Sequence, residues 1–301
     1  MKPALTLLLT LVSILTSAIP VSATEVFSDF SIGNLGFSRG REAGDRGLPD
    51  DTFPWGFSFG IRHPAFETVD FEMALRRHHV TGNTTELLLT HRSNFVELGV
   101  GTYVGIYNTE DKPALLQPGV LSRLRFNLAS FGFLSLTARA PLHDNPSSVG
   151  DYRQVTQEYE FGVFVPNVVL SLYYGSFAFD QRTEDDFTND LFTTYQLRAH
   201  VFQKNVPYRI DLAFGYHDYQ KEFLVSDETQ AFGALVAGTR LTADVSRQLT
   251  LFVELESAVY AFGREELLGR DGGGTFFFRS GAGMRYLLAP ATISVVAAQE
   301  Q

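Results

Sequence analysis

The sequence predicts an all-β fold: an antiparallel up-and-down transmembrane β-barrel of about fourteen strands, with twelve strands as the alternative. Two observations lead to this class. Short turn-forming spots recur some 36 to 43 residues apart, at Ser93-Asn94, Ala129-Ser130, Pro166-Asn167, Lys204-Asn205, Ser246-Arg247 and Ala289-Pro290. Between successive turns lie two strands of alternating hydrophobicity and one longer polar loop, which is typical of barrels whose short turns and long loops face opposite sides of a membrane.

The amino terminus carries the features of an export signal. Lys2 precedes an apolar run from Ala4 to Ile19, which is followed by a proline and by the small-residue site Val21-Ser22-Ala23. The run is shorter than the roughly 20 residues that a membrane-spanning helix needs. We therefore interpret residues 1–23 as a cleaved signal peptide and residues 24–301 as one barrel domain.

We place the strands in order from the alternation of apolar and polar side chains. The first five cover Glu25–Phe37, Phe53–Arg62, Phe66–His79, Thr84–Arg92 and Phe95–Tyr107, and nine more follow up to Leu288. These strands are about 10 to 16 residues long, whereas about 5 to 6 is the commonest length in globular sheets. Their length therefore favours a membrane barrel over a soluble β-sandwich, which alternates in the same way.

The strand that begins at Leu249 shows the two faces most clearly. Leu251, Val253 and Leu255 form an apolar series that suits lipid, and they alternate with Phe252, Glu254 and Glu256, which suit a polar lumen. Tyr260 continues the polar series and Ala261 the apolar one. Aromatic side chains also collect near strand ends on the apolar face, which is typical of the aromatic girdles at membrane interfaces, although an ordinary aromatic core is the alternative.

The longer polar segments should face the outside of the cell. They cover Asn108–Pro118, Pro141–Asp151, Asp180–Asn189, Asp218–Glu228 and Gly263–Gly274. Residues 39–51, between the first two strands, are a candidate for partly closing the lumen. The tail from Ala289 to Gln301 either lies in the periplasm or contains a further strand.

The last strand resembles the terminal-strand signal of bacterial outer-membrane β-barrel proteins. In Arg279-Ser-Gly281-Ala-Gly-Met284-Arg-Tyr286, a polar residue is followed by a glycine two positions on and then by apolar or aromatic residues. The chain departs from the pattern because it does not end in phenylalanine. The resemblance is to this porin-like class as a whole, and it implies a location in the outer membrane of a Gram-negative bacterium, with outer-membrane lipid, lipopolysaccharide and the outer-membrane assembly machinery as partners.

Composition excludes several kinds of function. The chain has no cysteine, which excludes disulfides and thiolate metal sites, and its formal net charge is -10. The negative charge argues against nucleic acid as a partner, because phosphate binding needs a basic surface. No motif indicates a cofactor, and the oligomeric state is left open.

Three motifs resemble catalytic or metal-binding sites without their context. Gly56-Phe-Ser58-Phe-Gly60 matches the Gly-x-Ser-x-Gly hydrolase turn, but no helix follows, so we expect Ser58 to point inward from a strand. His78 and His79 are adjacent on a strand and should point to opposite faces, so they cannot easily share a metal. The acidic residues between Asp180 and Asp190 match no calcium loop, and we interpret them as a solvated acidic surface.

We expect the function to be that of a porin-like channel or transporter for small solutes, and not that of an enzyme. The alternatives are a membrane-embedded lipid hydrolase, for which no serine and histidine pair is apparent, and a surface-anchoring barrel that acts through its loops. The inward positions predicted to line the lumen are Arg76, Glu97, Arg125, Arg139, Arg198, Asp211, Arg240, Glu254, Glu256, Arg279 and Arg285. Turn positions further predict that Arg240 faces Glu254, and that Arg198 lies near Asp211.

Overall fold

The computed structural model describes residues 23–33, 55–78, 82–109, 112–142, 152–182, 187–203, 205–262 and 278–288. The expected signal peptide, apart from Ala23, lies outside these ranges, as do residues 39–51, His79, the predicted loop 263–274 and the tail. None of the described residues belongs to a helix long and apolar enough to cross a membrane.

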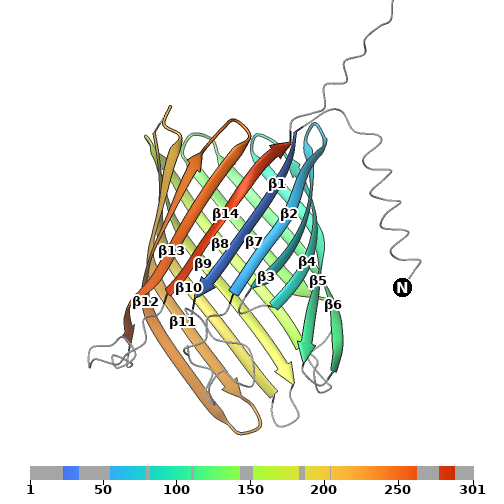
Figure 1. The fold of residues 1–301 in the computed structure, drawn as a ribbon. Coiled ribbons are helices and arrows are strands. Elements are labelled where there is room, and N and C mark those ends of the chain that lie inside the picture. Colours follow the sequence, from blue (N-terminus) through green and yellow to red (C-terminus); the bar gives the residue numbers. More distant parts are fainter. Residues whose placement is uncertain are drawn as a thin grey trace, which may run out of the picture.

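The described residues form fourteen strands in one closed barrel (Figure 1). Each strand pairs antiparallel with its neighbours in sequence, and β1 closes the barrel by pairing with β14. This confirms the predicted fold class and the count of fourteen. The strands are β1 (Thr24–Gly33), β2 (Trp55–Phe66), β3 (Val69–His78), β4 (Gly82–Arg92), β5 (Val96–Thr109), β6 (Lys112–Leu128), β7 (Gly132–Pro141), β8 (Tyr152–Val165), β9 (Val168–Arg182), β10 (Phe187–Phe202), β11 (Tyr208–Phe223), β12 (Glu228–Asp244), β13 (Leu249–Phe262) and β14 (Phe278–Leu288).

Short turns gather at one end of the barrel, the upper end in Figure 1. Ala129, Asn167 and Asn205, in three of the predicted turns, have positive φ angles of 50°, 63° and 68°. Asparagine tolerates this left-handed region better than most residues, so Asn167 and Asn205 help to fix two of these turns. Ser246 fixes another turn, because its Oγ accepts hydrogen bonds from the backbone N–H groups of Gln248 and Leu249 at 3.1 and 3.0 Å.

The other end of the barrel differs from the prediction. Residues 108–118 were expected to form a loop, but β5 continues to Thr109 and β6 begins at Lys112. The segments 180–189 and 218–228 are likewise mostly strand, so that paired ribbons extend beyond the main wall (Figure 1). The apolar and polar alternation stops where lipid ends, but backbone pairing needs no such alternation and continues.

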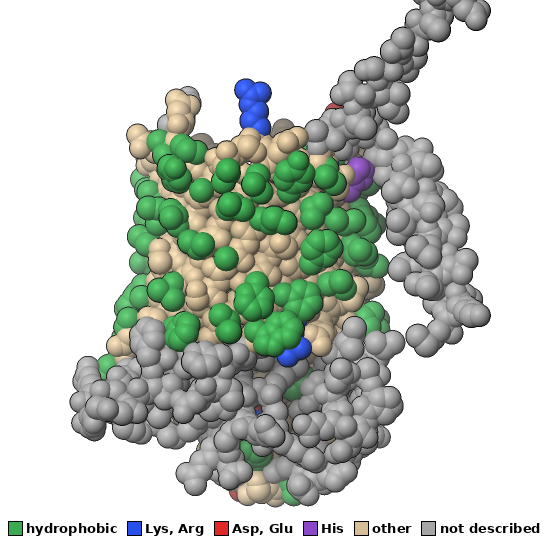
Figure 2. All heavy atoms as spheres, in the orientation of Figure 1, with side chains coloured by type: hydrophobic (Ala, Val, Ile, Leu, Met, Phe, Trp, Pro, Cys, Tyr) green, Lys and Arg blue, Asp and Glu red, His purple; other side chains and the backbone are tan. Residues whose placement is uncertain are grey.

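The outer wall is apolar and the interior is polar, the reverse of a soluble protein. Leu251, Val253 and Leu255 are 41%, 56% and 46% exposed, which confirms the predicted lipid-facing series. Figure 2 shows hydrophobic side chains over the height of the wall, with charged ones near its ends. The buried side chains, in contrast, include many polar and charged ones, such as Glu72, Glu86, Thr156, Gln196 and His217.

A β-bulge changes the faces near the end of β13. The register shifts between Leu235 and Val236, so that Val236 faces Ala258 while Leu235 faces Tyr260. The Tyr260 ring lies 5.0 Å from that of Phe262, a residue on the outer wall. The assignment of Tyr260 to the inner face is therefore wrong, because the extra residue shifts the strand by one position.

Candidate functional site in the barrel lumen

The described residues line two cavities inside the barrel. The larger has a volume of about 570 Å³ and the smaller one of about 260 Å³. Arg240 and Glu254 line both cavities, so this pair stands where the two meet. In the described lining of the larger cavity, four arginines are matched by four carboxylates. The space is therefore highly charged but electrically balanced.

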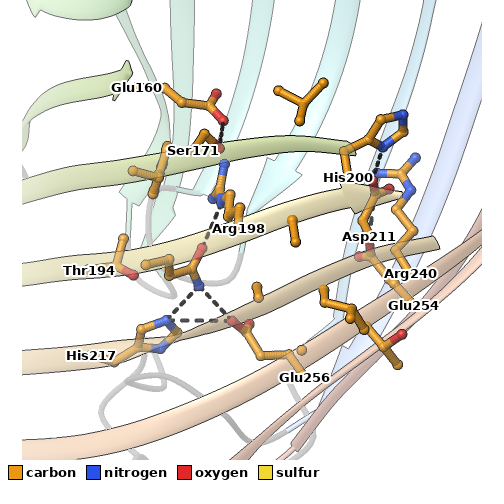
Figure 3. Close-up of a pocket in the computed structure, with 18 of the residues that line it drawn as sticks. Glu160, Ser171, Thr194, Arg198, His200, Asp211, His217, Arg240, Glu254 and Glu256 are labelled. Carbon is orange, nitrogen blue, oxygen red and sulfur yellow. Dashed lines mark hydrogen bonds and ion pairs between the residues drawn. The ribbon is translucent and has the colours of Figure 1, made fainter. Parts of the chain in front are cut away.

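Strand register places the charges of the larger cavity in two rows, each running across β10 to β14 (Figure 3). In one row, Arg198 is followed by Ala213, Gly238, Glu256 and Arg279 at directly paired positions. The next row contains His200, Asp211, Arg240, Glu254 and Gly281. Charges of opposite sign thus lie on neighbouring strands, an arrangement that stabilises a sheet by about 0.2 to 1 kcal/mol per pair.

The contacts within these rows follow the register. Arg240 Nη1 lies 3.7 Å from Glu254 Oε2, as predicted, and Arg279 Nη2 lies 3.0 Å from Glu256 Oε2. His200 and Asp211 pair through Nδ1 and Oδ1. Gln196 Nε2 also donates to Glu256 Oε1 at 3.0 Å. Glu256 is thereby fixed from two strands.

Arg198 and Asp211, predicted to lie near each other, are diagonal neighbours on the inner face and do not pair directly. Asp211 lies directly opposite His200, whereas Arg198 lies opposite Ala213. The β10–β11 turn is centred half a residue from the position assumed from Asn205, which gives Asp211 a different partner. Arg198 instead stacks on the Tyr173 ring at 3.5 Å and donates to Gln196 Oε1 at 2.9 Å.

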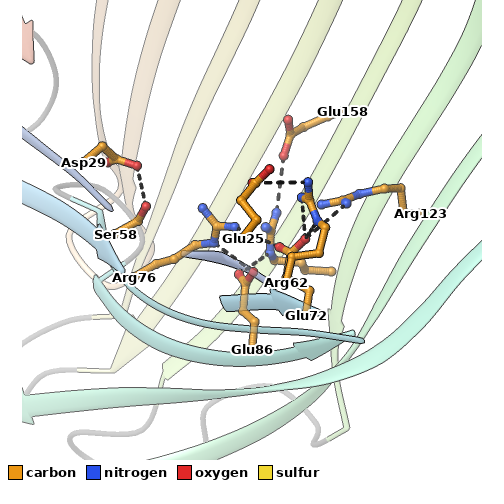
Figure 4. Close-up of polar contacts among 10 residues, drawn as sticks. Glu25, Asp29, Ser58, Arg62, Glu72, Arg76, Glu86, Arg123 and Glu158 are labelled. Atoms are coloured by element: carbon orange, nitrogen blue, oxygen red, sulfur yellow. Dashed lines mark hydrogen bonds and ion pairs between the residues drawn. The ribbon is translucent and has the colours of Figure 1, made fainter. Parts of the chain in front are cut away.

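A second network of charges fills the opposite side of the lumen (Figure 4). Glu72 accepts from Arg62 at 2.7 Å, and Glu86 lies between Arg76 at 2.9 Å and Arg139 at 3.0 Å. Arg139 also reaches Glu158 on β8, at 3.3 Å. The chain of contacts therefore links β2, β3 and β4 to β7 and β8 across the interior, and it braces one half of the wall.

Several inward arginines rest on aromatic rings that themselves lie over glycines. The guanidinium carbons of Arg125, Arg198 and Arg240 lie 3.8, 3.5 and 3.5 Å from the ring centres of Phe133, Tyr173 and Phe252. A Cβ atom on Gly162, Gly175 or Gly283 would come within 2.2, 3.1 and 2.5 Å of these same rings. Only glycine allows the rings to lie flat against the wall, where they support the guanidinium groups without filling the lumen.

The predicted lumen residues divide among these features. Arg125, Arg198, Asp211 and Arg279 line the larger cavity together with Glu256, and Arg240 and Glu254 line both cavities. Arg76 and Arg285 line the smaller cavity, and Arg139 belongs to the charge network. Glu97 lies opposite Arg125 in the register, near the short-turn end, and contacts neither cavity. The structure thus brings ten of the eleven positions together, while their role in passage stays a proposal.

Arg62 and Glu86 were missed, although both take part in the network. The alternation of inward and outward side chains along each strand carried a signal for both residues. Arg62 continues the inward series of Ser58 and Gly60, and Glu86 lies between Thr84 and Leu88, which are both buried. The contact of Arg139 with Glu86 carried no such signal, because Arg139 lies on β7 and Glu86 lies three strands away on β4. Glu158 lies on the adjacent strand β8, two residues from Thr156, which pairs directly with Arg139.

The remaining motifs have structural roles. Ser58 is buried on β2 and donates a hydrogen bond to Asp29, as expected for an inward strand residue. Asp180 and Asp190, expected to be solvated, lie 3.9 Å from Arg153 and 3.5 Å from Lys221 respectively. Across the described ranges, no group of three or more histidine, aspartate or glutamate side chains is placed to hold a metal ion.

Comparisons with known proteins give likeness of fold. No protein-family model matches the chain, and no curated sequence does. Among solved structures, the chain is similar to an outer-membrane channel from Pseudomonas putida F1, with 11% identity, a TM-score of 0.47 and coverage of 90% of this chain and 97% of the other. A porin has 7% identity and a TM-score of 0.43, with coverage of 88% of this chain and 100% of the other. The translocator domain of the autotransporter NalP from Neisseria meningitidis has 12% identity and a TM-score of 0.40, with coverage of 95% of each chain. These proteins are outer-membrane barrels, the class whose terminal-strand signal the last strand of this chain resembles. Their TM-scores lie below 0.5, so the function of this chain has to be inferred from its own lumen.

Proposed function

We propose that the protein is a channel of the bacterial outer membrane through which small polar solutes diffuse. The observation that carries this proposal is the pair of charged cavities inside a closed, apolar-walled barrel. Solutes in such a lumen exchange along the barrel axis, because the wall is sealed by backbone pairing and surrounded by lipid. Lining arginines and carboxylates in equal number support weak selectivity between simple cations and anions.

Neighbouring residues on β12 allow a sharp test. Gly238 lines the larger cavity, and a Cβ added there would meet its nearest atoms at an ordinary 3.6 Å. Thr239 points the other way, since it pairs with Leu212 and Leu255 on the outer wall. Gly238→Phe should narrow the lumen without straining the wall, whereas Thr239→Phe adds the same ring on the lipid side.

The measurement is single-channel conductance of the purified chain in a planar bilayer. We expect discrete openings for the unaltered protein, a lower conductance for Gly238→Phe, and no change for Thr239→Phe. Both variants should keep the gel mobility shift on boiling that marks a folded barrel. A folded protein without conductance, or equal effects of the two variants, would refute the channel and favour the hydrolase or loop-binding alternatives.

A further inference from the structure

The charged groups of the larger cavity divide into paired and unpaired ones. Arg240 pairs with Glu254, Arg279 with Glu256, and His200 with Asp211. Arg125, Arg198 and Glu160 also line the cavity, but they form no ion pair within the described part of the chain. Two positive charges and one negative charge are thus left to act on whatever enters.

The two unpaired arginines are held in place by uncharged groups. Arg125 stacks on Phe133 and donates from Nε to Asn127 Oδ1 at 3.1 Å. Arg198 stacks on Tyr173 and donates from Nε to Gln196 Oε1 at 2.9 Å. A guanidinium group has five N–H donors, so both keep donors on their terminal nitrogens for a carboxylate. Their positions are fixed before any ligand arrives, which lowers the entropy that binding costs.

The unpaired carboxylate lies between these arginines. Arg125, Ser135, Glu160, Tyr173 and Gln196 face one another in a single row across β6 to β10. Arg198 reaches back over Tyr173 toward this row, and Figure 3 shows Glu160, Ser171 and Arg198 close together. Glu160 Oε1 accepts a hydrogen bond from the neutral Ser171 hydroxyl at 2.6 Å. Its charge is therefore held in position and not cancelled by an ion pair.

We propose that this part of the lumen binds amino dicarboxylates, meaning acidic amino acids and acidic peptides of similar size. The two carboxylates of such a ligand would bind Arg125 and Arg198, and its ammonium group would bind Glu160. A ligand with two carboxylates and one ammonium group presents one opposite charge to each of Arg125, Arg198 and Glu160. A dicarboxylate without the ammonium group meets repulsion from Glu160, and an uncharged side chain leaves one arginine unpaired.

The proposal rests on the proposed channel, since the ligand must reach the lumen. It is tested with L-glutamate as the probe, glutarate as the same chain without the ammonium group, and L-glutamine as the form without the second carboxylate. Binding to the detergent-folded full chain is measured by ligand-observed NMR titration. Blockage of ion current by each compound is measured in a planar bilayer. We expect glutamate to bind about ten-fold more tightly than either analogue, the usual size of one lost charge-assisted contact.

Three variants assign the roles. Glu160→Gln should weaken the binding of glutamate and strengthen the binding of glutarate. The two affinities then change in opposite directions for two compounds of the same chain length. Arg125→Gln and Arg198→Gln should each reduce glutamate binding to the level of glutamine. Arg247→Gln removes an exposed arginine from the β12–β13 turn and should change none of these affinities. A general loss of folding would lower all affinities together and would show as a lost heat shift on gels.

The outcomes separate the two proposals. Glutarate binding as tightly as glutamate, or a Glu160→Gln variant that leaves their ratio unchanged, would overturn the binding site even if the barrel conducts. Glutamate binding with the expected variant pattern in a protein that conducts no ions would support the site and refute the channel.

Discussion

Val253→Arg is the perturbation that most directly tests whether the wall faces lipid. Val253 lies four residues after the start of β13, and at about 3.3 Å per residue and a tilt of about 40° this is about 10 Å into the wall. An apolar band about 25 Å tall places it near the middle. Its cross-strand partners are Leu241 and Ala282, so no carboxylate is adjacent. We expect the free energy of unfolding to fall by about 2–4 kcal/mol.

Val245→Arg provides the matched control. Val245 is 60% exposed, much as Val253 is, but it lies in the turn before β13, where an arginine costs about 0–1 kcal/mol. Urea unfolding in phospholipid vesicles measures both, with fluorescence of the single tryptophan, Trp55, as the signal. For a soluble protein, arginine at either exposed valine would change stability by within about 0.5 kcal/mol. Equal, small effects of the two variants would therefore contradict the membrane-spanning wall.

Further predictions concern the interior and the turns. Arg139→Gln leaves the buried Glu86 with one arginine fewer and should lower the free energy of unfolding by about 3–5 kcal/mol in the same urea assay; a loss below 1 kcal/mol would contradict the bracing role. Glu254→Gln should shift the reversal potential in a salt gradient toward anion preference, and Arg240→Gln toward cation preference; shifts of the same sign would count against both residues lining one path. Ala129→Gly relieves a positive φ angle and should raise stability by about 0.5 kcal/mol, while a destabilised variant would show that the turn carries no strain.

The wall was predictable because lipid imposes a local rule. Alternation along a strand fixes which side chains face outward, and asparagine in a tight turn marks where the chain reverses. These signals give the fourteen strands and the pairing of Arg240 with Glu254, since both depend on residues near one another in sequence.

The predictions that failed depend on interactions that a local sequence pattern does not contain. The extensions to Thr109 and from Lys112 show no regular alternation of apolar and polar residues to detect, since residues 112–118 read Lys-Pro-Ala-Leu-Leu-Gln-Pro. A single bulge reverses the face of Tyr260 without a residue that marks it. The contact of Arg139 on β7 with Glu86 on β4 arises from the curvature of the closed sheet, which no hairpin register determines.

The seam between β1 and β14 has a consequence for how the protein reaches its final form. Every other pairing joins consecutive strands and forms from a hairpin, whereas this one joins Thr24 to Leu288 at the two extremes of the sheet. Until that pairing occurs, the intermediate is an open sheet with two unsatisfied edges, each a template for another chain. Closing the longest loop in the molecule is therefore the step at which assembly and aggregation compete, and residues that hasten the meeting of the two terminal strands protect the whole chain.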